Sequence, residues 1–101
     1  MEQPRALLEV RDAAGRTASQ AADEIMAEAL GFDISRTTTT IAGEEAVILD
    51  NLPGQDLNRQ VVVVHQGRLY KFTFTPMGGD TAGVESLYRT MMNSFSFLPQ
   101  G

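Results

Sequence analysis

The stretch that decides the fold runs over residues 58–75 and reads NRQVVVVHQGRLYKFTFT. A β-branched run, a two-residue turn containing glycine and an alternating aromatic run together predict a β-hairpin. In the second strand Tyr70, Phe72 and Phe74 share one face. The first strand carries four consecutive valines and is therefore apolar on both faces. Such a strand is typical of the centre of a sheet that is covered on both sides.

Upstream of this hairpin, the pattern predicts a short strand over residues 6–11, a helix that begins at Thr17 and ends near Gly31, and a second hairpin over residues 34–50. Thr17 and Gln20 have the spacing of a helix capping box. The inner face of this helix is mostly alanine, so we expect it to approach the sheet closely. The second hairpin is expected to turn over residues 42–45.

Downstream of the hairpin, apolar residues recur at helical spacing and predict a last helix. Its inner face would hold Val84, Leu87, Tyr88, Met91 and Phe95. Glu85 and Arg89 are four residues apart and are expected to pair on the outer side.

The predicted order is β-α-β-β-β-β-α, with an optional terminal strand around residues 95–97. Two successive hairpins favour an antiparallel sheet. We therefore predict one α+β domain over residues 1–101, in which two helices flank an antiparallel sheet on one or both faces.

Composition excludes several classes of function. The net charge is −5, which argues against binding nucleic acid or an anionic membrane through bulk electrostatics. The absence of cysteine excludes disulfides and thiolate metal sites. No apolar run approaches the roughly 20 residues of a membrane helix, so no direct membrane insertion is expected.

Residues that could carry chemistry are sparse. His65 is the only histidine and stands beside Gln66 and Gly67, with neither a nucleophile nor a second metal ligand in view. Adjacent carboxylates in a turn, Glu44 and Glu45, are expected to point apart and stay solvated. The segment 78–81 lacks the lysine of a phosphate loop and is interpreted as the start of the last helix. We predict no catalytic residue, metal or cofactor.

Candidate partner-binding residues lie in a loop and at the hairpin. The loop Pro53-Gly54-Gln55-Asp56 is either a type II turn or a contact loop that a rigid sheet presents. Arg59, Arg68 and Lys71 are close to the hairpin and are either solvated edge charge or a docking patch for an acidic partner. The candidate set is Pro53, Gly54, Gln55, Asp56, Arg59 and Arg68.

Aromatic and methionine side chains form a further set with two interpretations. They either fill the core under the last helix or line a pocket for a small apolar ligand. The set comprises Tyr70, Phe72, Phe74, Tyr88, Met91, Met92 and Phe95. A cystatin-like inhibitor is a further hypothesis, which requires the loop at residues 53–56 to lie beside the hairpin turn on one rim.

The second half of the chain resembles the PsbP-like family of α/β domains, which includes Ran-binding proteins and many bacterial envelope proteins and lipoproteins. The matching features are the strand over 59–64, the return over 67–74, and the tail from Leu87-Tyr88 to Asn93-Ser94-Phe95-Ser96-Phe97. The similarity covers residues 17–98 and is strongest from residue 46 onward.

The resemblance implies a non-enzymatic protein-binding or assembly module, associated with the cell envelope or another extracytoplasmic space. The family's usual opening, a strand pair built around a proline and a tryptophan, is missing, since this sequence contains no tryptophan. The domain would then be shortened at its N-terminal edge. An uncovered sheet edge would be satisfied by pairing with a partner protein, a second copy of the chain being one candidate.

Overall fold

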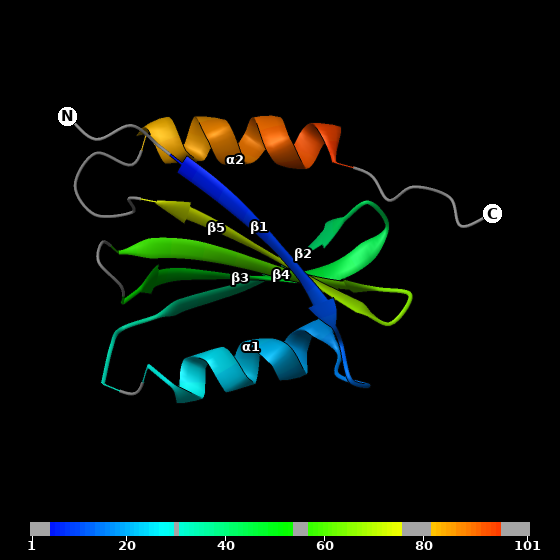
Figure 1. The fold of residues 1–101 in the computed structure, drawn as a ribbon. Helices are drawn as coiled ribbons and strands as arrows, with labels where there is room; N and C mark the ends of the chain where they lie inside the picture. The colour runs from blue at the N-terminus through cyan, green and yellow to red at the C-terminus, as the bar shows by residue number, and fades with distance from the viewer. Residues whose placement is uncertain (1–4, 30, 54–56, 76–81, 96–101) are drawn as a thin grey trace.

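The computed structural model describes residues 5–29, 31–53, 57–75 and 82–95. Its elements are β1 (Arg5–Asp12), α1 (Ala18–Ala27), β2 (Ser35–Ile41), β3 (Glu44–Leu52), β4 (Asn58–His65), β5 (Arg68–Thr75) and α2 (Ala82–Ser94). The predicted α+β fold, with an antiparallel sheet and two helices, is confirmed (Figure 1). The optional terminal strand falls mostly on residues outside the described ones.

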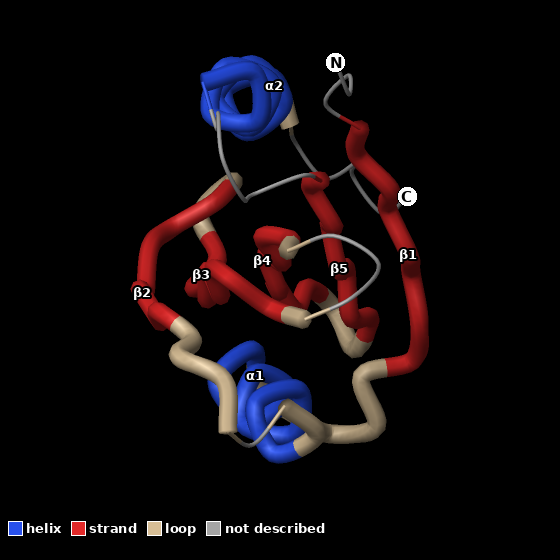
Figure 2. Tube along the Cα trace, turned by 90° about the vertical axis from the view of Figure 1, so that its left-hand side faces the viewer, coloured by secondary structure: helices blue, strands red, loops and turns tan. Residues whose placement is uncertain are grey.

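The five strands form one antiparallel sheet in the order β1-β5-β4-β3-β2. β4 is central, and Val61, Val62 and Val63 are completely buried. Figure 2 shows why both faces of β4 are covered: α1 lies on one side of the sheet and α2 on the other. The prediction of a central strand apolar on both faces is therefore confirmed.

Two tight turns close the hairpins. Ala42-Gly43 joins β2 to β3 and Gln66-Gly67 joins β4 to β5, and all four residues have positive φ. Two successive positive φ angles are typical of a type I′ turn, whose twist matches that of the strands. The predicted turn over residues 42–45 was too long, because Glu44 and Glu45 already belong to β3.

Helix α1 lies close to the sheet because its buried residues are small. Ala18, Ala21 and Ala22 are buried, and the helix packs chiefly on β3 and β4. The predicted capping box is present: Thr17 Oγ1 accepts from the Gln20 amide, and Gln20 Oε1 accepts from the Thr17 amide. The helix ends at Ala27, earlier than predicted.

Helix α2 covers the other face and closes a second, aromatic core. This core contains Ile41, Ala46, Val61, Val63, Phe72, Phe74 and Val84, with Ile48, Tyr70, Leu87, Tyr88, Met91, Met92 and Phe95 packed against it. The predicted inner face of the last helix is thus confirmed. The predicted Glu85–Arg89 pair is wrong: within the described residues Glu85 binds Arg59 of β4 instead. Neither described helix is both long and apolar enough to cross a bilayer.

Candidate functional site

The most exposed element of the sheet is its edge strand β1. Seven of its eight residues are exposed, including Leu7 at 59%, Leu8 at 43% and Val10 at 47%. The strand is nevertheless firmly placed, because all eight residues are in register with β5. Among the described residues β5 is its only strand neighbour, so the outer side of β1 is an open edge. Long edge strands with exposed apolar side chains are prone to pair with another strand.

Side chains alternate between the two faces of β1. Leu8 and Val10 are in register with Phe72 and Tyr70, and so they extend the aromatic face under α2. Leu7 lies on the opposite face, which α1 leaves open because that helix packs chiefly on β3 and β4. Apolar surface is therefore exposed on both faces of the edge strand.

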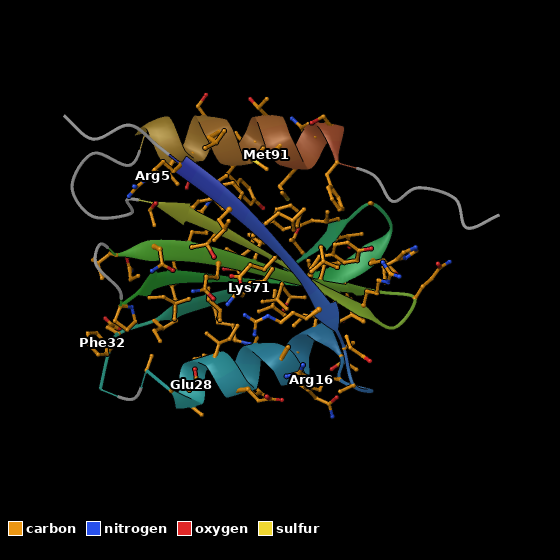
Figure 3. The ribbon with its side chains drawn as sticks, in the orientation of Figure 1. Arg5, Arg16, Glu28, Phe32, Lys71 and Met91 are labelled. Carbon is orange, nitrogen blue, oxygen red and sulfur yellow. The ribbon has the colours of Figure 1, made fainter. Side chains whose placement is uncertain are left out.

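A groove of about 150 Å³ separates β1 and β5 from α1. Its lining combines three cations and three carboxylates with an apolar floor: Glu9, Arg11, Arg16, Ala21, Glu24, Ile25, Glu28, Leu69 and Lys71. In Figure 3, Arg16 and Glu28 mark the two ends of α1, and Lys71 lies on the sheet. All three cations are bound to carboxylates of the groove, since Arg16 binds Glu24 while Arg11 and Lys71 share Glu9.

The pKa of Glu9 is lowered in this groove. The hydrogen bond from Arg11, 2.8 Å from Glu9 Oε2, lowers it most. Burial acts in the opposite direction, and Lys71 lowers the pKa further. The groove therefore favours an ionised Glu9 at the edge of the sheet.

We expect titration of Glu9 to reveal this environment. Followed by carboxyl NMR, its pKa should lie below that of an unfolded glutamate, and Arg11→Gln should raise it. Because the folded pKa is the lower one, Glu9 stabilises the fold above the unfolded pKa, and this contribution is lost as the pH falls through the folded value. Its size should be under about 1 kcal/mol, since the pairs are partly exposed. An unchanged pKa in Arg11→Gln would contradict the assignment to Arg11.

Arg68, one of the sequence-predicted contact residues, lies next to the edge strand. It begins β5, is exposed, and is in register with Asp12 of β1. An open hollow of about 440 Å³ is lined by Val10, Arg11, Asp12, Gln66, Gly67 and Arg68. The β4–β5 turn and the end of β1 thus form one continuous surface.

The other predicted contact residues lie elsewhere. Pro53 follows β3 at the opposite end of β4 from the turn at Gln66-Gly67, and Gly54, Gln55 and Asp56 lie outside the described residues. Pro53, where the loop begins, therefore lies away from that turn, and the rest of the loop that the cystatin-like hypothesis uses falls outside the described residues. The expected grouping of basic residues is also absent, because Arg59 and Arg68 stand at opposite ends of the hairpin and Lys71 points to the other face.

Arg59 is held inside the molecule by four side-chain contacts. Its side chain is only 9% exposed and binds both oxygens of Asp50, with Nε 2.6 Å from Oδ1 and Nη2 3.2 Å from Oδ2. The same Nη2 lies 2.6 Å from Glu85 Oε1, and the guanidinium lies 4.7 Å from the centre of the Tyr88 ring. This cluster joins β3, β4 and α2, so Arg59 helps to dock the helix on the sheet.

Two pKa values are shifted in this cluster, by burial and by the neighbouring charges. Burial lowers the pKa of Arg59, but hydrogen bonds and ion pairs with Asp50 and Glu85 outweigh it, so the net pKa is raised. Burial raises the pKa of Tyr88, against the opposing charge of Arg59. Both shifts favour the protonated states in the folded protein, and Arg59 remains a permanent cation.

His65 has a carboxylate partner that the sequence pattern did not reveal. Its Nδ1 lies 2.8 Å from Glu44 Oε2, in a pair whose side chains are 22% and 37% exposed. The two residues come together because the antiparallel register of β3 and β4 places Ala46 opposite Val63, and therefore Glu44 opposite His65. The pair lies near the turns that begin β3 and end β4, and both side chains are partly exposed.

Other candidate chemistry finds little support in the parts of the chain that are described. No group of three or more His, Cys, Asp or Glu side chains there could hold a metal ion. The aromatic set packs against itself, with Phe74 edge-on to Tyr88 at 5.7 Å and Phe72 edge-on to Phe95 at 5.1 Å. These rings fill the second core, as the core interpretation predicted. The segment 78–81 lies outside the described residues.

Comparisons of the chain with models of protein families, with curated proteins and with solved structures gave no match.

Proposed function

We propose that this protein is a non-enzymatic protein-binding or assembly module that binds a partner by adding a strand to its sheet at β1. The observation that carries the proposal is the combination of order and exposure in β1: eight residues in register with β5, and three large apolar side chains exposed. In this mode of recognition, backbone hydrogen bonds supply affinity and the side chains of the edge supply specificity.

The opposite edge supports the choice of β1. β2 consists mainly of threonines, and its Arg36 is bound to Asp23 and Ser19 of α1. A polar edge of this kind is poorly suited to hydrophobic pairing, whereas β1 offers Leu7, Leu8 and Val10. Arg68 remains in the proposed contact surface because its hollow adjoins the end of β1.

We also propose membership of the PsbP-like family. Its support is the hydrophobic pattern over residues 46–97 together with the α+β architecture. This membership carries no catalytic residue to the chain, and it adds cell-envelope proteins to the candidate partners.

Site-specific photo-cross-linking tests the docking function. With a benzoylphenylalanine at Val10 on β1, we expect a discrete cross-linked product in a lysate of the source organism. The matched control carries the probe at Thr38, an exposed position on β2. A partner that adds a strand should also protect the β1 amides from hydrogen exchange, and Leu8→Lys should abolish both signals.

Two outcomes would contradict the proposal. One is equal cross-linking from Val10 and Thr38, which would indicate non-specific contact. The other is the absence of any product from Val10, whether with another protein or with the same chain.

A further inference from the structure

We infer that the strand added to β1 comes from a second copy of this chain, in an antiparallel β1–β1 pair centred on Leu7. The inference rests on the proposed docking function and identifies its partner. The register of this pair is restricted by the geometry of antiparallel strands and by the charges along β1, which reads RALLEVRD.

Geometry restricts how two copies of β1 can pair. Two identical edges join antiparallel about a two-fold axis perpendicular to the sheet, and each residue then stays on its own face. Opposed residues must therefore both have odd or both have even numbers. Within the central part of β1, this rule leaves registers centred on Leu7, Leu8 or Glu9.

The charges along β1 separate these registers. Centred on Leu7, the pair places Arg5 opposite Glu9 of the second copy, twice by symmetry. Centred on Leu8, it places Arg5 opposite Arg11, again twice. Centred on Glu9, it places the two Glu9 carboxylates opposite each other on the axis. Only the first register combines opposite charges with apolar contact.

The surroundings of Leu7 favour the same register. Leu7 is the most exposed of the large apolar side chains of β1, and α1, the described helix on its face of the sheet, packs chiefly on β3 and β4. At the two-fold axis each Leu7 would be covered by its copy, and each Leu8 would oppose Ala6. In this register the Glu9 carboxylate can accept from Arg5 of the second copy while keeping Arg11 and Lys71, since an ionised carboxylate offers about four acceptor sites.

Disulfide trapping tests this register directly. Because the chain has no cysteine of its own, a single introduced cysteine can bond only to the same position in the second copy. Three single variants are compared: Leu7→Cys, Leu8→Cys and Val10→Cys. In the proposed pair, the residues at position 7 oppose each other with Cβ atoms about 4.5–5.5 Å apart, and those at position 8 are diagonal neighbours at about 7–8 Å. Those at position 10 are separated by about 20 Å. All three side chains are exposed, so the reduced variants should keep the far-UV spectrum and Tm of the parent chain.

The expected result is a covalent dimer that forms fastest with Leu7→Cys and at least about tenfold more slowly with Val10→Cys, because a disulfide tolerates little deviation in distance. Sedimentation of the unmodified protein should show a monomer–dimer equilibrium between about 10 µM and 1 mM, the range expected for a small interface. Faster trapping with Leu8→Cys, or equal rates for all three variants, would overturn the register.

A monomer at every concentration would overturn self-pairing. If Val10 then cross-linked to a different protein, the docking function of β1 would stand without the dimer. If it cross-linked to nothing, both proposals would fail.

Discussion

Replacing Phe72 by alanine is expected to lower the free energy of unfolding by about 3–5 kcal/mol, the usual cost of removing a buried phenylalanine ring. Phe72 is 1% exposed, stacks with Phe74 at 6.4 Å and meets Phe95 edge-on at 5.1 Å. Its removal leaves a cavity between β5 and the end of α2. Urea denaturation followed by circular dichroism measures the loss.

The control makes the same chemical change at the surface. Phe32 is 55% exposed and lies before β2, outside both cores, as Figure 3 shows. Phe32→Ala should therefore cost less than about 0.5–1 kcal/mol. Similar losses at the two positions would mean that the aromatic side chains do not form the core described above. That result would favour the alternative interpretation, in which these side chains line a pocket for a small apolar ligand.

Replacing Arg59 by alanine is expected to cost about 2–3 kcal/mol. Removing one partner of a buried ion pair costs about 3–5 kcal/mol when the other charge is left buried and unpaired. Here the loss should be smaller, because the side chains of Asp50 and Glu85 are 22% and 38% exposed and can regain water. The loss should appear as loosening of α2, since Arg59 joins that helix to β3. Thermal unfolding and amide exchange along α2 measure both effects.

Two variants calibrate this result. Arg59→Lys keeps the charge but loses the two-pronged contact with Asp50, so its cost should be intermediate. Arg16→Ala breaks the exposed pair with Glu24 and should cost less than about 1 kcal/mol. Equal effects of Arg59→Ala and Arg16→Ala would show that the buried cluster contributes no more than a surface salt bridge.

The architecture could be predicted because its signals are local. The four consecutive valines from Val61 to Val64 predict a strand that is covered on both faces. This prediction does not require knowledge of which strands lie beside it. The capping box at Thr17 and the alanine face of α1 were likewise readable within a few residues. The predicted turn over residues 42–45 was two residues too long. Glu44 and Glu45 are polar, as turn residues often are, but they are the first two residues of β3.

The candidate site could be predicted only in part, because it depends on which strands become neighbours. Arg68 was named from its place beside the turn, but its proximity to β1 results from pairing between strands almost sixty residues apart. Arg59 was named as a candidate contact residue, and its enclosure by Asp50 and Glu85 depends on strand and helix packing that the local pattern does not reveal. One signal was present in the sequence: an arginine at alternate spacing with Val61 and Val63 on a buried face needs a carboxylate nearby.

By itself, the sequence determined the kind of each element and the apolar character of its faces, since periodicity and turn residues act over a few positions. Only the tertiary structure decided that β1 is the exposed edge, that His65 meets Glu44 and that Arg59 is enclosed. These outcomes depend on strand order and register, which are set by the joint packing of the sheet and two helices and not by any single segment.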